Sequence, residues 1–357
     1  MATGFPTKAN WSAGDVLTAS QMDDLAGTLN TVQAPLGNAA GKNAIINGAF
    51  NVWQRGTSFT PTPGGGIIYT ADRFNSYNNG TGALTISQQA LTPGSITGYE
   101  SPYYLQAALA SAGTTTGWNW VQPIENVQTF AGQTVTLSFW AKSTNSATTT
   151  ITFSQKFGSG GSTQVDTNSS AITLTSTWTR YTATVTLPSI SGKTIGTGSS
   201  LTLTWNMGAT VSTYGFWGVQ LEPGSVATNF QTATGTLQGE LAACQRYYWQ
   251  LTSNTAYGRF GTGSCSGTTN ASILIRFPVT MRTSPAALST TGTGSNYCVI
   301  NSTGSVVALN AVPTYDATNT EGAVVAVTVA AGLAAGSATQ LLSNNLSTAY
   351  LGWSAEL

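Results

Sequence analysis

Strict alternation of apolar and polar residues is the pattern that most constrains the fold of this chain. Between Thr134 and Ala141, the side chains of Val135, Leu137 and Phe139 fall on one face of an extended strand. The same period of two recurs in three later segments, with apolar residues at Tyr181, Ala183, Val185 and Leu187, at Leu201, Leu203 and Trp205, and at Trp217, Val219 and Leu221. Such alternation is typical of antiparallel sheets that pack one face together and leave the other polar. Residues 46–235 are therefore predicted to form a jelly-roll β-sandwich.

Segment 1–45 has a helical pattern instead. Thr18 and Gln21 have the spacing of a capping box, which marks the start of a helix. Apolar residues then recur at helical spacing, at Met22, Leu25, Leu29 and Val32. We predict one amphipathic helix over residues 18–33. Because its single apolar stripe needs a partner chain or the body of the protein to cover it, segment 1–45 is expected to anchor the chain.

The last third of the chain is predicted to be a short helix followed by a second β domain. Apolar residues share one side of a helix over residues 236–249, at Leu237, Leu241, Cys244 and Tyr248. The clearest strands beyond this helix are 272–278 and 322–329. The fold class is therefore mostly β, with an N-terminal anchoring helix, a jelly-roll sandwich, a linker helix and a distal β-sandwich-like domain. We expect the last two regions to make up residues 236–357.

The composition argues against nucleic-acid binding and against catalysis. Charged residues make up 7% of the chain, Lys plus Arg equals Asp plus Glu at 12 each, and there is no histidine. Phosphate binding needs a dense basic patch, and histidine is the usual proton shuttle and commonest metal ligand. The few acids are scattered, and neighbouring Asp72 and Arg73 are interpreted as a structural pair rather than a catalytic one. We therefore expect no nucleic-acid partner and no enzymatic activity.

The remaining sequence signals concern compartment and packing. The first residues lack a signal-peptide pattern and no stretch approaches 18 apolar residues, so we expect synthesis in the cytoplasm and no membrane insertion. Cys244, Cys265 and Cys298 are odd in number and widely spaced, which favours small buried hydrophobes over a disulfide pair with one cysteine left over. The run 246–249 is predicted to pack either between the domains or around a three-fold axis.

Several segments resemble tailed-bacteriophage proteins. Residues 11–22, WSAGDVLTASQM, resemble the opening of many phage minor tail and fibre proteins. The segments 47–56, 69–74, 139–142 and 216–224 resemble jelly-roll domains of phage tail proteins, which are similar to carbohydrate-binding modules of glycoside hydrolases. Three more segments resemble the link and distal domain of such proteins, at 240–248, 277–285 and 354–357. The resemblance implies a homotrimer that attaches to other virion proteins through its N-terminal segment, with sugar binding in some members.

Aromatic side chains outside the core pattern are the candidate carbohydrate-binding residues. Sugars present flat C–H faces with polar rims, which amphipathic rings suit. The candidates are Trp140, Trp178 and Arg180, which are out of phase with the core face, the pair Trp118 and Trp120, and the pair Tyr103 and Tyr104. The alternative is that these rings fill the core of the other sheet or a subunit interface. Trp53 and Trp217 are assigned to core packing.

A structural calcium ion is implied by the resemblance, because related jelly rolls often carry one. The oxygens that could hold it belong to Asn47, Asn51 and Glu222. Many relatives have an acid where this chain has Asn51.

Four functions fit these observations. The first is a virion tail fibre or receptor-binding protein that contacts host surface glycans for host attachment. The second is a head fibre or capsid decoration protein built from the same modules. The third is a polysaccharide-degrading tailspike, and the fourth is a free carbohydrate-binding module of a secreted enzyme. We expect the non-catalytic fibre, located in the virion tail.

Overall fold

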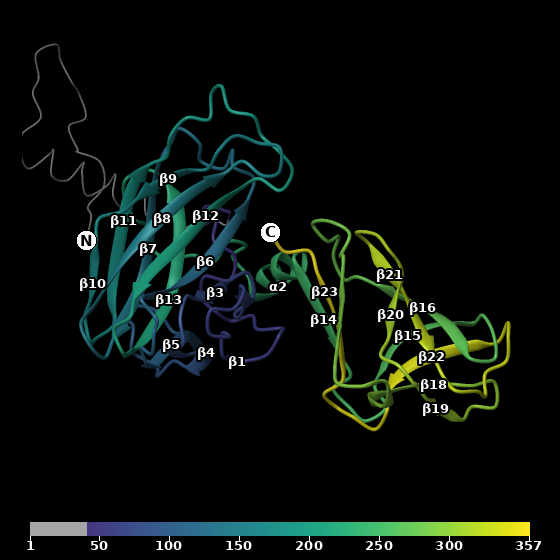
Figure 1. Cartoon of the computed structure of the whole chain (residues 1–357). Helices are drawn as coiled ribbons and strands as arrows, with labels where there is room; N and C mark the ends of the chain where they lie inside the picture. The colour runs from purple at the N-terminus through teal and green to yellow at the C-terminus, as the bar shows by residue number, and fades with distance from the viewer. Residues whose placement is uncertain (1–40) are drawn as a thin grey trace, which may run out of the picture.

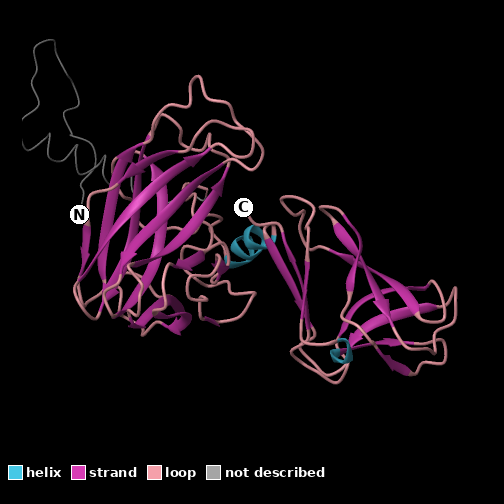
Figure 2. Ribbon diagram, in the orientation of Figure 1, coloured by secondary structure: helices cyan, strands magenta, loops and turns pink. Residues whose placement is uncertain are grey.

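The computed structural model describes residues 41–357, which fold into four antiparallel sheets and one α-helix (Figures 1 and 2). The predicted mostly-β fold class is confirmed. The predicted helix over 18–33, with Met22, Leu25, Leu29 and Val32, lies outside the described residues. No helix between residues 41 and 357 has both the length and the apolar character needed to cross a membrane.

Sheets 1 and 2 pack face to face as the predicted sandwich, called here the N-terminal sandwich. Sheet 1 has the order β1 (Ser58–Phe59), β4 (Ala83–Ala90), β5 (Tyr103–Ser111), β13 (Ser212–Pro223), β7 (Thr134–Ser143) and β11 (Thr179–Thr186). Sheet 2 has the order β10 (Ile172–Leu174), β8 (Ala147–Lys156), β12 (Ser200–Gly208), β6 (Gly117–Glu125), β3 (Asn75–Asn78) and β2 (Ile68–Tyr69), and β9 (Val165–Asn168) pairs with β8. Several pairs join strands that are far apart in sequence, such as β5 with β13 and β6 with β12, so much of the pairing is non-local.

The inward faces of the sandwich are those that the alternation predicts. Val135, Leu137 and Phe139 of β7 are fully buried, as are the alternating residues of β12 and the end of β13. Trp120 lies at the centre, with its ring stacked on Phe216 at 4.7 Å between centroids. Phe216 belongs to sheet 1 and Trp120 to sheet 2, so this contact joins the two layers. Buried apolar area of this kind contributes about 25 cal/mol per Å².

Sheets 3 and 4 form the C-terminal unit around a second core. Sheet 3 has the order β14 (Tyr248–Thr252), β23 (Tyr350–Ser354) and β17 (Leu288–Thr290). Sheet 4 has the order β19 (Val306–Ala308), β18 (Tyr297–Ile300), β22 (Ala338–Ser343), β15 (Arg259–Cys265), β16 (Asn270–Arg276), β21 (Gly322–Thr328) and β20 (Thr314–Thr318), and a 3-10 turn, η1 (Gly294–Asn296), precedes β18. The predicted strands at 272–278 and 322–329 are thus β16 and β21. All three cysteines are buried and free, as small hydrophobes would be.

Helix α2 (Leu237–Gln245) links the N-terminal sandwich to the C-terminal unit. The prediction that Leu237 and Leu241 lie on its buried face is wrong. Leu237 and Leu241 are 63% and 37% exposed, whereas Glu240 and Cys244 are buried. Glu240 decides this orientation, because its carboxylate accepts hydrogen bonds from the backbone N–H of Asn47 at 2.7 Å and of Thr234 at 2.8 Å. A carboxylate with such donors is stable when buried, and it turns the leucines outward.

The residues after α2 pack between the two parts, which is the first of the two predicted alternatives. The Arg246 guanidinium pairs with Glu125 of β6 at 3.1 Å, and the Tyr247 hydroxyl donates to the same carboxylate at 2.9 Å. The Tyr248 carbonyl accepts from the Gln54 side chain at 2.6 Å. The chain end returns to this junction, so that the C-terminus lies near α2 (Figure 1). Asp72 and Arg73, which were predicted to form a structural pair, have separate partners instead. Asp72 accepts hydrogen bonds from Gln54, and Arg73 pairs with Glu356 near the end of the chain.

Candidate functional site

Trp118 and Trp120 are core residues, so their prediction as sugar platforms is wrong. They are 2% and 0% exposed and belong to the central cluster of the sandwich. The alternation of β6 turns both rings inward, and Trp118 meets Tyr214 of sheet 1 at 5.4 Å between centroids. For Trp118 and Trp120 the alternative prediction is correct, because their rings fill the core between the sheets.

Trp140 is on the outer face of sheet 1, but it is covered. It packs in a small apolar cluster with Leu91, Trp217 and Phe230, and only 8% of it is exposed. The Arg180 guanidinium lies 4.8 Å from the Trp140 ring centroid and donates to the Ser138 hydroxyl and the Thr228 carbonyl. Trp140 and Arg180 therefore hold the loops against the sheet rather than face solvent. Trp217 is buried, as predicted, although in this outer cluster.

Trp178 and Tyr104 are brought together on the same outer face. Their ring centroids lie 5.3 Å apart, both side chains are partly exposed, and Lys142 reaches over both rings. Burial raises the pKa of Tyr104, whose hydroxyl donates to the Gln106 side chain at 3.2 Å. Tyr103 is 39% exposed but precedes Tyr104 in β5, so the strand places the two side chains on opposite faces. The structure thus keeps Trp178 with Tyr104 and separates Tyr103 from them.

The three predicted calcium ligands do not form one site. The Glu222 carboxylate is engaged by the Lys42 ammonium at 2.8 Å, which supplies a positive charge at that position. Burial alone would raise the pKa of Glu222, but hydrogen bonds from Lys42, Thr228 and Gln220 lower it below its usual value. The Asn47 side chain is committed to the backbone of Val52 and Asp72, and it closes the 47–52 turn.

Asn51, the third predicted ligand, has a buried side-chain oxygen without a hydrogen-bond partner. Within residues 41–357, no group of three or more His, Cys, Asp or Glu side chains is placed to hold a metal ion. Internal contacts thus use the oxygens of Asn47 and Glu222, whereas the Asn51 oxygen has no partner among the described residues.

A groove on the outer face of sheet 2 was not predicted from the sequence. It has a volume of about 590 Å³ and crosses strands β3, β6, β12 and β8. Strand register places Thr204, Val121 and Asn75 in one row, and Asn119 beside Tyr77 in the next. The rest of its lining comes from Ile67, Pro123, Lys156, Gly158, Gly198, Ser200, Thr202 and Leu357. We call this the sheet 2 groove.

The sheet 2 groove combines apolar surface with polar side chains, and apart from Lys156 the side chains that line it are uncharged. Amides and hydroxyls alternate with the apolar surfaces of Val121 and Pro123. The Asn119 side-chain oxygen is buried without a hydrogen-bond partner, although buried polar atoms in folded proteins nearly always have one. The Asn119 amide therefore has an acceptor that no group of the described residues uses. The signal in the sequence was the polar half of each alternating strand, which is also the pattern of any solvated sheet face.

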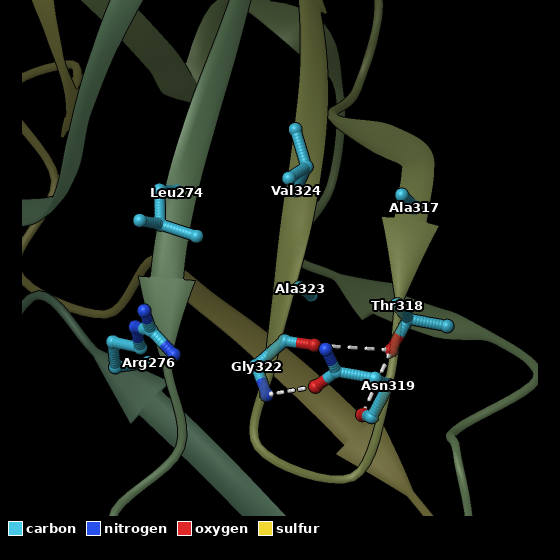
Figure 3. A pocket seen from close by; sticks show the side chains of 8 residues that line it. All are labelled: Leu274, Arg276, Ala317, Thr318, Asn319, Gly322, Ala323 and Val324. Carbon is cyan, nitrogen blue, oxygen red and sulfur yellow. Dashed lines mark hydrogen bonds between the residues drawn. The ribbon is translucent and has the colours of Figure 1, made fainter.

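A smaller hollow of about 210 Å³ lies on sheet 4, between β16, β21 and β20. Figure 3 shows the Asn319 side chain turned toward the backbone of Gly322. Its oxygen accepts from the N–H groups of Glu321 at 2.8 Å and Gly322 at 3.0 Å. Because this amide oxygen is used to close the turn between β20 and β21, the hollow offers mainly apolar surface from Leu274 and Val324.

Comparison with known proteins finds no matching family model and no similar curated protein. Among solved structures, the chain is similar to the enzymatically active domain of tailspike protein 4 of bacteriophage CBA120, with 16% identity and a TM-score of 0.33 over 51% of this chain and 21% of that one. It is also similar to a xylan-binding domain of Paenibacillus barcinonensis, with 14% identity and a TM-score of 0.32 over 53% and 98% of the two chains.

A third similar structure is a carbohydrate-binding module in complex with β-1,4-galactotriose, with 9% identity and a TM-score of 0.31 over 51% of this chain and 99% of that one. The chain thus spans about a fifth of the tailspike chain and nearly all of the two binding modules. At these TM-scores the likenesses establish neither a family nor a function.

Proposed function

We propose that this protein is a non-catalytic structural component of a tailed-phage virion, a tail fibre or receptor-binding protein whose N-terminal sandwich binds host surface glycans. The observation that carries the glycan proposal is the sheet 2 groove. Its volume of about 590 Å³ lies in the range of ordinary ligand sites. The virion and tail parts of the proposal are supported by the sequence resemblance, above all by residues 11–22.

The groove suits a neutral sugar chain. Hydroxyl groups of a sugar can donate to Asn119 and can exchange hydrogen bonds with Asn75 and Thr204, which line the groove. The C–H faces of the sugar can rest on Val121 and Tyr77. Exposed hydrogen bonds of this kind contribute about 1 kcal/mol each, so one site is weak. In a homotrimer present in several copies, avidity would turn weak sites into firm attachment.

The non-catalytic part of the proposal is supported by the groove lining. Glycosidases use two carboxyl groups on either side of the scissile bond, and the described lining of the groove contains neither Asp nor Glu. The proposed action is therefore binding without cleavage. Incubation with host polysaccharide should leave chain lengths unchanged, and shortened chains would contradict this part of the proposal.

A glycan array with the full chain, followed by calorimetry on any hit, tests the groove. Asn119→Ala removes the unpartnered oxygen, and Thr204→Val removes a hydroxyl while keeping the shape of the side chain. Each change should weaken binding of a neutral glycan by about fivefold. Thr314→Ala, on exposed β20, is the matched control and should leave affinity unchanged.

Two outcomes would contradict the proposal. Binding that survives both groove substitutions would place the glycan elsewhere, and an array without any bound glycan would remove the binding function. The virion location has a separate test, which is cryo-electron microscopy of intact particles. Density for this chain on the capsid and not at the tail would contradict the tail assignment.

A further inference from the structure

The outer face of sheet 1 carries a pair of partly exposed rings that the sheet 2 groove does not involve. Trp178 precedes β11 and Tyr104 is the second residue of β5, and their rings meet at 87° with centroids 5.3 Å apart. Strands β13 and β7 lie between β5 and β11 in the sheet. Since the groove is on the outer face of sheet 2, the rings and the groove are on opposite sides of the sandwich.

Gly215 of β13 makes room for the Trp178 ring. A Cβ atom at this position would lie 2.9 Å from Cη2 of Trp178 and 3.2 Å from Cγ and Cε of Lys142. In the sheet, Gly215 is paired with Lys142 on one side and Gln106 on the other. Because Gly215 has no side chain, the indole of Trp178 can reach across β13, which lies between the strands that carry Lys142 and Gln106.

The Lys142 ammonium lies near both rings without an anionic partner. Its nitrogen is 5.0 Å from the Trp178 centroid and 5.5 Å from the Tyr104 centroid. Among residues 41–357, it takes part in none of the ion pairs, which are formed by Lys42, Arg55, Arg73 and Arg246. A cation partly shielded from water by aromatic rings attracts an anion more strongly than one in free solvent.

We propose that Trp178, Tyr104, Lys142 and Gln106 form a second binding site, the Trp178 platform, for an acidic pyranose such as a uronic acid residue. The C–H face of the sugar rests on the Trp178 indole. Its carboxylate pairs with the Lys142 ammonium, and its hydroxyls meet the Gln106 amide and the Tyr104 hydroxyl. This proposal goes beyond the neutral glycan proposed for the sheet 2 groove and does not depend on it.

The charge of Lys142 distinguishes an acidic sugar from a neutral one. An ammonium–carboxylate hydrogen bond is about twice as strong as a neutral one, and it weakens as added salt screens the charges. A neutral sugar would keep the ring contact and the hydroxyl contacts but would lack the ion pair with Lys142. The platform should therefore bind an acidic oligosaccharide about tenfold more tightly than its methyl ester, which has the same skeleton without the charge.

Ligand-observed NMR and calorimetry on the full chain test this difference. The probes are the trisaccharides of galacturonic acid, mannuronic acid and guluronic acid, each compared with its methyl ester at low and high salt. We expect at least one acid to bind more tightly than its ester, with a preference that shrinks in salt. Trp178→Ala and Lys142→Gln should each weaken its binding by about tenfold, while Lys142→Arg should retain most of it.

Further variants separate this site from the groove. Gly215→Ala should weaken acid binding by displacing the indole, and circular dichroism checks that each variant is folded. Asn119→Ala in the sheet 2 groove and Thr314→Ala on β20 should leave acid binding unchanged. The proposal is overturned if no acid binds more tightly than its ester, if Trp178→Ala leaves acid binding intact, or if Asn119→Ala abolishes it.

Discussion

The guanidinium of Arg73 is ion-paired with the carboxylate of Glu356, which lies 283 residues further along the chain. Both side chains are buried, and Arg55 shares the same carboxylate at 3.2 Å. The Arg73 guanidinium also lies 3.5 Å from the Tyr247 ring centroid and donates to the Pro123 carbonyl at 2.6 Å. This cluster ties the end of the C-terminal unit to the N-terminal sandwich.

Removing the charge of Glu356 should destabilise the protein strongly. Glu356→Gln leaves two arginines at the junction without their carboxylate, and breaking a buried pair in this way costs about 3 kcal/mol or more. The free energy of unfolding, measured by urea denaturation of the full chain, should fall by that amount.

The exposed ion pair across the same junction is the matched control. Arg246 and Glu125 are 41% and 39% exposed, so water screens their attraction. Glu125→Gln should therefore cost about 1 kcal/mol or less. Equal losses from the two substitutions would show that burial does not decide the strength of these contacts.

Asp72 should make stability depend on pH. Burial raises the pKa of Asp72 from its ordinary 3.8 to about 6, against the lowering effects of Arg55 and of hydrogen bonds from Gln54. The folded chain then holds a proton that the unfolded chain releases, so the free energy of unfolding falls as pH rises from about 4 to 6. The fall due to Asp72 alone should be about 2 to 3 kcal/mol.

Asp72→Asn isolates this contribution from those of the other carboxyl groups. Urea unfolding of both proteins across the pH range should show the variant gaining stability relative to the parent as pH rises through the window. Parallel profiles would mean that Asp72 titrates near its ordinary value.

Substitutions on the buried face of α2 should lower the free energy of unfolding much more than substitutions on its exposed face. Glu240→Ala removes the acceptor for the N–H groups of Asn47 and Thr234, which should cost about 2 to 3 kcal/mol because buried donors are left unpaired. Leu237→Ser and Leu241→Ser change exposed side chains and should alter the free energy of unfolding by no more than about 0.5 kcal/mol. A large loss from the leucine substitutions would indicate that another part of the assembly covers them.

The strands and their core faces could be predicted because alternation is a local property. The residues of β7 and β12 that face the core follow directly from the period of two. The orientation of α2 could not be predicted from its apolar stripe, because the partners of Glu240 at Asn47 and Thr234 come from other segments. The candidate binding surfaces were predicted only in part. Trp178 and Tyr104 were both predicted and lie together, whereas the sheet 2 groove was not predicted.

The sequence by itself determined a mostly-β chain with two cores, a short connecting helix and buried free cysteines. Which rings are covered and which remain accessible depends on how the strands and loops pack in three dimensions. Alternation assigns Trp118 and Trp140 each to one of two faces, but strand pairing and the loops over each sheet decide whether that face meets solvent. Trp118 is enclosed between the sheets, Trp140 is covered by an outer cluster, and Trp178 lies over Gly215 and stays partly exposed. Long-range contacts such as Arg73 with Glu356 have the same origin, since nothing local to either residue specifies its partner.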